Sequence, residues 1–313
     1  MGVVALLATS CNKEKQTDSM VYRGYSFDEQ FDVEYVEESR AYIDNQYKMM
    51  FEAGDEVMLF NIDDETPANS QCAMYVVEEA GYQPTFAPYQ ADVTIDDAMK
   101  SAKYAFYPGN NVIKDLNVLA NENRCVFKLL PEQNYRELNG AAVIPQEALY
   151  MAAKIDNAAE TNFAFRNICG VLKMRFYSPA AKTISSIAIT DNTMSLTGNV
   201  MLKVNEVDPA RMMELFRNYP ANEAAVLEYK EEVGYSVEGS GHTLTLDCGT
   251  GVALGTTADA AKDFLFVLRP LALMNGFDMV ITFSDNTTKT ISLTSDNKIK
   301  PNTVRVFPAL NVD

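Results

Sequence analysis

The sequence contains no tryptophan and a single histidine, His242, among 313 residues. The lack of tryptophan argues against a sugar platform built on that side chain, and one histidine excludes a metal site with several histidine ligands. Basic residues are also scarce, because 26 Lys and Arg stand against 43 Asp and Glu and give a net charge of -17. Nucleic acid and anionic lipid surfaces repel such a chain, so we expect no nucleic-acid partner.

The apolar run at the start of the chain, Val3 to Ala8, is too short to span a membrane, which takes about 20 apolar residues. It fits the end of a signal peptide, although no basic residues precede it. With Leu7 and Ala8 at the fourth and third positions before Cys11, the run resembles a bacterial lipobox, in which the cysteine becomes the lipidated first residue. We therefore expect lipidation at Cys11; the alternative is a buried N-terminal strand with an ordinary cysteine.

Motifs for catalysis, cofactors and metals are missing. His242 has no nucleophile motif in an interpretable relation to it, so we expect a surface histidine beside a turn. The glycines of 249–251 and Gly255 imitate a dinucleotide-binding pattern, but no helix start follows, which favours a loop between antiparallel strands. The acidic residues 63–65 and 96–97 lack the spacing of a calcium loop and predict solvated turns. We expect no enzyme activity, no cofactor and no metal.

Hydrophobic residues make up 47% of the chain, enough for two cores in a protein of this length. The most informative stretch is 162–177. Its apolar residues Ile168, Leu172, Met174 and Phe176 are expected on one side of a strand, with Gly170 between them and Lys173 and Arg175 on the other side. This alternation predicts a strand with one face in a core. Because the sequence before this stretch differs in character from the sequence after it, we place a domain boundary at the start of the stretch.

Strand patterns occupy both sides of this boundary. Before it they cover 31–36, 51–60 with a turn at Gly54-Asp55, 104–109 and 126–131, while 145–153 fits either a helix or an extended segment. After it they recur at 184–189, 200–204, 242–248, 264–268, 279–283, 290–293 and 303–307, with turn residues at 239–241 and 284–286. One inserted helix is predicted from Asp208, with Pro209 in its first turn. We expect a mostly β chain: a signal end and tether at 1–20, and antiparallel β-sandwich domains at 21–160 and 161–313 with minor helical insertions.

Four cysteines remain after Cys11, two in each expected domain. The possible disulfides are Cys72 with Cys125 and Cys169 with Cys248, in a compartment that permits them. Buried free thiols are the alternative for each pair, because the sequence does not supply the Cα separation.

Several segments together resemble the fimbrillin family, the type V pilus subunits and related lipoproteins of Gram-negative anaerobes. The resemblance lies in their order: FEAGDEVMLF, AKYAFYPG, LYMAAK, FAFRNICGVLKMRF, MSLTGNVML, HTLTLDCG, FLFVLRPL and FDMVITFSD. It implies two tandem transthyretin-like domains, a non-enzymatic lipoprotein on the surface of the outer membrane, and assembly into a pilus by β-strand exchange. Its implied partners are other pilus subunits, surface ligands of host or bacterium, and the membrane through the lipid anchor alone. The helix expected at 208–218 is not part of the fimbrillin pattern.

The resemblance also implies that an Arg-specific protease removes an N-terminal strand. Arg40 follows the first strand pattern, whose residues Phe31, Val33 and Tyr35 share one face, and Arg23 is the alternative cleavage site. The competing hypothesis is a surface lipoprotein that binds a glycan or another soluble ligand without polymerising.

Overall fold

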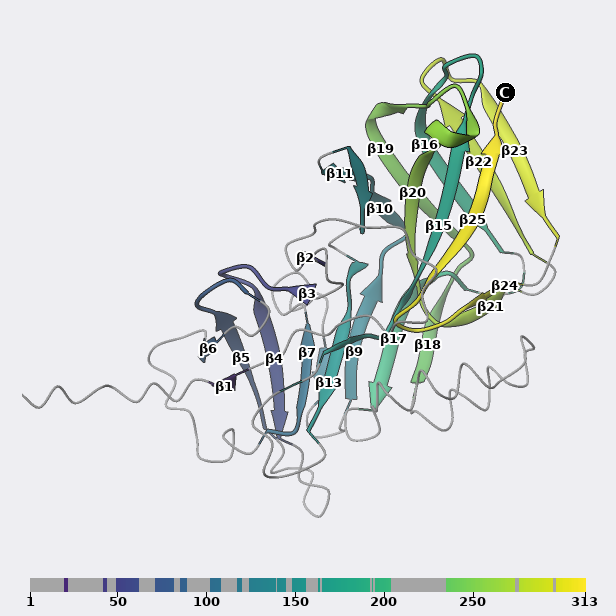
Figure 1. The fold of residues 1–313 in the computed structure, drawn as a ribbon. Helices are drawn as coiled ribbons and strands as arrows, with labels where there is room; N and C mark the ends of the chain where they lie inside the picture. Colours follow the sequence, from purple (N-terminus) through teal and green to yellow (C-terminus); the bar gives the residue numbers. More distant parts are fainter. Residues whose placement is uncertain are drawn as a thin grey trace, which may run out of the picture.

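The computed structural model describes residues 20–21, 42–43, 49–61, 71–81, 85–88, 102–107, 117–119, 124–138, 140–144, 148–155, 163, 165–191, 193, 195–203, 235–273, 276–294 and 297–313. These residues form strands almost throughout (Figure 1). Among the described residues, the short 3-10 helix η5 (Ala258–Ala260) is the one helical element whose two ends are both seen. The expectation of a mostly β chain with several antiparallel sheets is thus confirmed, and the transthyretin-like detail stays a prediction.

The largest sheet has seven strands in the order β1-β6-β5-β4-β7-β13-β14, and all its neighbours are antiparallel. Its strands are β1 (Met20–Val21), β4 (Glu56–Asn61), β5 (Gln71–Val77), β6 (Thr85–Pro88), β7 (Tyr104–Tyr107), β13 (Met151–Lys154) and β14 (Arg166–Asn167). The predicted turn before β4 is present: Gly54 has φ 92°, and the Asp55 carboxylate accepts the Glu52 N–H at 2.8 Å and the Tyr107 hydroxyl at 3.2 Å. A glycine is needed here because other residues rarely adopt this φ.

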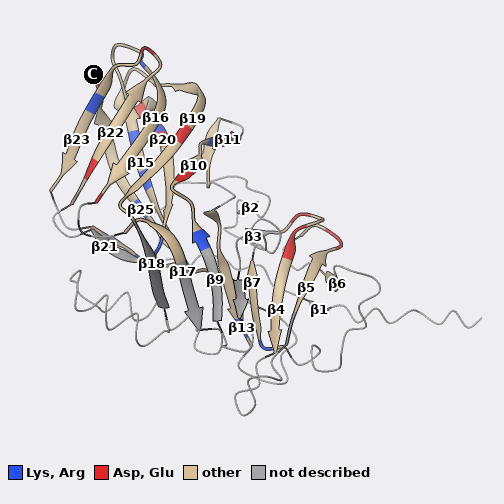
Figure 2. Ribbon diagram, turned by 180° about the vertical axis from the view of Figure 1, so that it is seen from behind, with Lys and Arg blue, Asp and Glu red and all other residues tan. Residues whose placement is uncertain are grey.

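Acidic residues gather at the edge of this sheet where β4 begins and β5 ends (Figure 2). Glu52, Glu78 and Glu79 are exposed there. Partial burial, together with the charge of Asp55, raises the pKa of the Glu56 carboxyl. The carboxylates of Glu52, Glu78 and Glu79 therefore face solvent, whereas Asp55 is buried.

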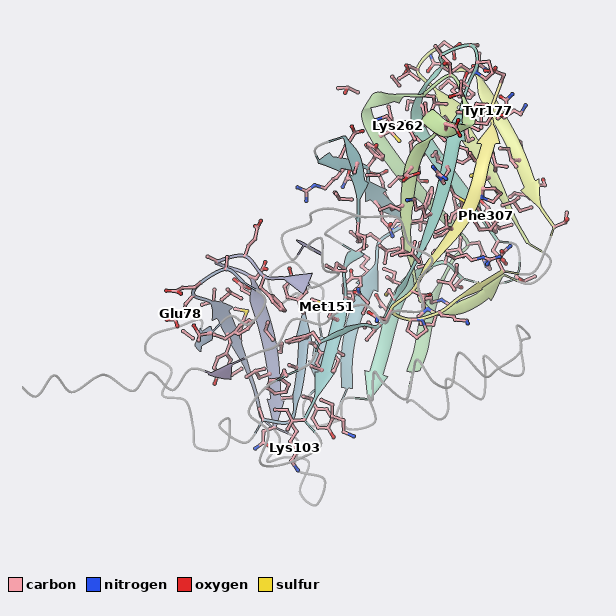
Figure 3. The ribbon with its side chains drawn as sticks, viewed as in Figure 1. Glu78, Lys103, Met151, Tyr177, Lys262 and Phe307 are labelled. Carbon is pink, nitrogen blue, oxygen red and sulfur yellow. The ribbon has the colours of Figure 1, made fainter. Side chains whose placement is uncertain are left out.

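Two sheets face each other in the C-terminal half. One has five strands in the order β10-β19-β16-β22-β23, and the other has three in the order β20-β15-β25. Their bounds are β10 (Glu132–Asn134), β15 (Gly170–Tyr177), β16 (Thr183–Thr190), β19 (Thr243–Ala253), β20 (Lys262–Leu268), β22 (Phe277–Phe283), β23 (Thr288–Leu293) and β25 (Val304–Asn311). Side chains fill the space between them (Figure 3). Two pairs are parallel, β10 with β19 and β15 with β25, and the other pairs are antiparallel.

A four-stranded sheet, β18-β17-β9-β8, joins residues from both sides of the predicted boundary. Its strands are β8 (Asn117–Leu119), β9 (Arg124–Leu129), β17 (Thr197–Lys203) and β18 (Tyr235–Gly241). Strand β10 also crosses this point, since it pairs with β19. The smaller pairs are β2 (Tyr42–Ile43) with β3 (Met49–Met50), β11 (Arg136–Leu138) with β12 (Ala141–Val143), and β21 (Leu271–Leu273) with β24 (Asn297–Ile299). The domain boundary at 160 and 161 stays a prediction.

The buried apolar residues form two clusters. The first contains most buried residues from Phe51 to Val171, and the second fills the C-terminal sandwich from Leu172 to Val312. Strands β15 and β20 contribute to both, because successive side chains point to opposite faces. On β20, Phe264, Phe266 and Leu268 belong to the second cluster, and Leu265 and Val267 to the first.

The stretch 162–177 differs from the prediction in two respects. Ile168 belongs to the first cluster, whereas Leu172, Met174 and Phe176 belong to the second. Lys173 points away from the second cluster, as expected, but it is only 3% exposed and its Nζ lies 2.7 Å from Asp263 Oδ2. This face is therefore buried as well. The Asp263 carboxylate compensates the positive charge of Lys173, as the burial of a charged group requires.

The other predicted strands of the C-terminal half are confirmed, with bounds that shift by a few residues. The turn at 284–286 is present: Asn286 has φ 65°, and the Asp285 carboxylate accepts the Thr287 N–H at 2.9 Å. The turn expected at 239–241 is wrong, because these residues end β18. Residues 151–154 form strand β13, so the end of the segment 145–153 is extended and not helical. The strand expected at 31–36 and the helix expected at 208–218 lie outside the described residues.

Candidate functional site

The residues that the sequence assigns to anchoring and maturation lie outside the described residues. They are Cys11, Arg23, Phe31, Val33, Tyr35 and Arg40. Their roles stay predictions.

A short strand does lie next to them in sequence. Strand β1 pairs antiparallel with β6, with Met20 opposite Phe86 and Val21 opposite Thr85. It forms one edge of the seven-stranded sheet, and Phe86 on β6 is fully buried. Because β1 precedes both Arg23 and Arg40, a cut after either arginine would separate it from the rest of the sheet.

The cysteines divide into two groups. Cys169 and Cys248 are buried free thiols in different clusters, so the suggested pair between them is not formed. Burial raises the pKa of both thiols, that of Cys248 to about 12, which keeps them protonated at neutral pH. Cys72 and Cys125 lie on β5 and β9, and their pairing stays a prediction.

His242 is the single residue between β18 and β19, so the turn expected beside it is absent; it is half-buried, and its Nδ1 is 3.0 Å from the Asp191 carbonyl oxygen. The glycine pattern at 249–251 is part of a β-bulge inside β19 and not the predicted loop. Ser186 pairs with Asp247 and Ile184 with Val252, so four residues of β19 stand opposite Ser185. No helix begins there, which leaves no place for a pyrophosphate on a helix N-terminus. The acidic residues 63–65 and 96–97 lie outside the described residues.

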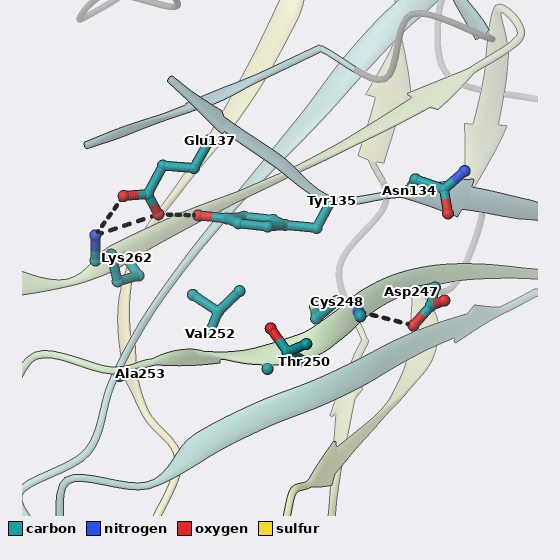
Figure 4. Close-up of a pocket in the computed structure, with 11 residues that line it drawn as sticks. Asn134, Tyr135, Glu137, Asp247, Cys248, Thr250, Val252, Ala253 and Lys262 are labelled. Atoms are coloured by element: carbon teal, nitrogen blue, oxygen red, sulfur yellow. Dashed lines mark hydrogen bonds and ion pairs between the residues drawn. The ribbon is translucent and has the colours of Figure 1, made fainter. Parts of the chain in front are cut away.

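The bulge forms one wall of a cavity of about 580 Å³ (Figure 4). Strand β10 pairs with β19 only as far as Asp247, and the chain then turns through Tyr135 into β11. In the described structure β19 has no strand partner on this side from Cys248 to Ala253. The cavity occupies this opening, with Asn134, Tyr135 and Glu137 on one side and Lys262 of β20 at one end.

Three side chains in the cavity form one hydrogen-bonded group. The Tyr135 hydroxyl donates to Glu137 Oε2 at 2.8 Å, and Lys262 Nζ lies 3.3 Å from Glu137 Oε1. The Tyr135 ring packs on Phe264, with 5.3 Å between the ring centroids. Burial and the carboxylate of Glu137 raise the pKa of the Tyr135 hydroxyl, so it stays a donor. Glu137 and Lys262 are each one third exposed and remain accessible from the cavity.

Sequence reasoning missed this group. Tyr135 and Glu137 lie in a short polar stretch without a motif, and Lys262 is far along the chain. The parallel pairing of β10 with β19 and the position of β20 in the facing sheet bring these residues together, and no local pattern signals such distant partners.

Among the described residues, no group of three His, Cys, Asp or Glu side chains is placed to hold a metal ion. The same part of the chain contains no helix that is long and apolar enough to cross a membrane.

Comparison with models of known protein families finds no match, and comparison with curated proteins finds none either. Solved structures do show similarity. The chain is similar to a candidate cell adhesion protein from Bacteroides uniformis, with a TM-score of 0.46, 10% identity and coverage of 84% of this chain and 88% of the other. A candidate cell adhesion protein from Bacteroides ovatus also has a TM-score of 0.46, with 11% identity and coverage of 83% of this chain and 83% of the other.

A fimbrial protein from Bacteroides ovatus gives a TM-score of 0.36 and 12% identity over 86% of this chain and 47% of the other. Because these TM-scores lie below 0.5, we base the functional proposal on the residues of this chain.

Proposed function

We propose that this chain is a non-enzymatic cell-surface protein of the fimbrillin type, a pilus subunit or pilus-associated adhesin that assembles by β-strand exchange. The order of its sequence motifs supports the class. The observation that carries the assembly step is the place of β1, an edge strand that precedes both candidate cleavage sites.

Removal of β1 would expose the edge of β6. The backbone groups of β6 that pair with Met20 and Val21 would then lack partners, while Phe86 keeps its position in the core. An unpaired edge is a template for an incoming strand, which restores the hydrogen bonds. The donor is an extended segment of another subunit. A cut after Arg40 would also remove Phe31, Val33 and Tyr35, whereas a cut after Arg23 would leave them.

The experiment is limited digestion of the purified protein with an Arg-specific protease, followed by N-terminal sequencing and size measurement by light scattering. We expect a new N-terminus after Arg40 or Arg23 and oligomers whose size grows with protein concentration. The double variant Arg23→Lys and Arg40→Lys is the control, since it keeps both charges and resists the protease. A cleaved protein that remains monomeric at every concentration contradicts strand exchange.

Attachment to the outer membrane through lipid on Cys11 is the second part of the proposal. Acyl chains contribute about 0.8 kcal/mol for each buried CH₂ group, so two or three chains hold a protein on a membrane. In cells, Cys11→Ala should move the protein from the membrane fraction to the soluble fraction. Unchanged membrane retention of this variant contradicts lipidation at Cys11.

Ligand binding without polymerisation is the second candidate function. The observation that favours it is the polar cavity between β10, β11 and the bulge of β19. Small-molecule sites in proteins have volumes of about 300–1,000 Å³, and this cavity lies within that range.

A further inference from the structure

The cavity beside the β19 bulge has the chemistry of a carbohydrate site, and we propose that it binds a neutral saccharide. This inference deepens the second candidate function and does not depend on strand exchange. Its first support is the geometry. The bulge of β19 forms one wall and the chain from β10 into β11 forms the other. The lining comes from residues 134, 135, 137, 247–253 and 262 (Figure 4).

The polar groups in the cavity suit hydroxyl groups better than anions. Glu137 is already compensated by Lys262 and by the Tyr135 hydroxyl, so the group presents a donor and an acceptor side by side without a net charge. A sugar hydroxyl both donates and accepts, and it can bridge such a pair. An anion would meet the carboxylates of Glu137 and Asp247, and the described lining has only Lys262 to compensate them.

The Tyr135 ring supplies an apolar surface at the same place. Its side chain is partly exposed, and in Figure 4 the ring lies across the cavity from Val252 and Thr250. The C–H groups on one side of a pyranose ring pack against an aromatic face, while its hydroxyls point to the rim. Tyrosine is suited to this contact because one end of its side chain is apolar and the other is polar.

The side chains are held in place before any ligand arrives. Phe264 supports the Tyr135 ring, and the Tyr135 N–H donates to the Asp247 carbonyl at 2.7 Å. On the opposite wall, the Gly249 N–H donates to Asp247 Oδ1 at 3.0 Å, which fixes the start of the bulge. A pre-organised site loses little conformational entropy on binding, so weak contacts with hydroxyl groups suffice.

The test uses the uncleaved full-length protein and a panel of neutral disaccharides: lactose, maltose, cellobiose and N,N′-diacetylchitobiose. Saturation-transfer NMR detects binding, and titration calorimetry measures the Kd. We expect at least one sugar to bind, and its Kd to rise about tenfold or more in Glu137→Gln and in Lys262→Gln, because each substitution breaks the pair that faces the hydroxyls.

Two further variants separate the site from general effects. Ala253→Leu narrows the cavity without removing a polar group, so it should weaken binding while the melting temperature stays close to that of the native protein. Lys289→Gln is the matched control, since Lys289 is a strand lysine that donates to the Asp313 carbonyl at 2.5 Å outside the cavity, and its Kd should not change.

Three results would overturn the assignment. They are no binding by any sugar of the panel at millimolar concentration, binding that persists unchanged in Glu137→Gln and Lys262→Gln, and binding of inorganic phosphate or Ca²⁺ at this site in place of sugar. Since the protein is uncleaved in every measurement, failure here is separate from failure of the assembly proposal.

Discussion

The side-chain amide of Gln133 hydrogen-bonds both backbone groups of Val267. Gln133 Nε2 donates to the Val267 carbonyl at 2.8 Å, and Gln133 Oε1 accepts the Val267 N–H at 2.9 Å. Both residues are almost fully buried. The amide thus takes the place of a neighbouring strand at the edge of β20, while the backbone of β10 pairs with β19 in the opposing sheet. One short strand therefore connects the two sheets of the C-terminal sandwich.

Loss of this amide should destabilise the protein. Gln133→Ala leaves a buried N–H and a buried carbonyl unpaired, which costs about 1–3 kcal/mol for each group that water does not reach. We expect a lower free energy of unfolding in urea. Glu132→Ala is the control, because Glu132 is exposed on the same strand and its removal keeps the backbone pairing. Equal stability of the two variants would show that the amide contacts contribute nothing.

The buried ion pair between β15 and β20 predicts an asymmetry. Asp263→Ala removes the carboxylate from Lys173, which is 3% exposed, and should cost about 3 kcal/mol, the low end for a broken buried pair because Asp263 is 26% exposed. Lys173→Met should cost less than about 1 kcal/mol, since Asp263 keeps Arg175 at 3.1 Å and contact with water. Urea unfolding of both variants measures the difference, and the reverse order would contradict this account.

The strands of the C-terminal half could be predicted because their alternation is local. Phe277, Met279, Ile281 and Phe283 all point into the second cluster, as a period of two requires. The burial of Lys173 could not be predicted, because the pattern of a charged residue between apolar ones normally marks a solvated face. Its partner Asp263 lies on a different strand, and only the register of β15 with β20 brings the two together.

The candidate site was harder to predict than the fold for the same reason. The glycines of the bulge were visible in the sequence, but the pairing of Asp247 with Ser186 and of Val252 with Ile184, which creates the bulge, was not. The pairing of β10 with β19 joins residues on opposite sides of the predicted boundary. Local propensity carries no information about such distant partners.

These pairings give a test of the domain boundary. The boundary at 160 and 161 predicts that a fragment of residues 161–313 folds alone. That fragment lacks β10 and Gln133, so we expect residues 131–313 to unfold at a higher urea concentration. Circular dichroism during urea titration measures both midpoints. Equal midpoints would mean that β10 adds nothing to the C-terminal sandwich, and a shorter fragment without a cooperative transition would count against the boundary.

Gly170 at the start of β15 lies against the chain between β24 and β25. A Cβ at this position would meet the Lys300 carbonyl oxygen and, at 2.8 Å, the Cγ2 atom of Ile299. Because the carbonyl belongs to the backbone, Gly170→Ala should displace it and cost about 1–3 kcal/mol. Thr290→Ala, at an exposed strand position, is the control. A thermal melt in which both variants match the native protein would contradict the close approach.

The buried thiol of Cys248 predicts sensitivity to alkali. Burial raises its pKa from 9.0 to about 12, and the nearby charge of Asp247 acts in the same direction. The folded protein therefore holds a proton that the unfolded chain loses above pH 9, so the stabilisation is complete below pH 9 and is lost as the pH rises toward 12. Each such thiol lowers the free energy of unfolding by about 1.4 kcal/mol per pH unit in this window.

Cys248→Ala loses some packing at every pH, so the slope of the free energy of unfolding against pH is the quantity to compare. Between pH 9 and 10.5, urea unfolding should give a shallower decline for Cys248→Ala than for the native protein. Equal slopes would mean that the thiol ionises as easily in the folded protein as in the unfolded chain.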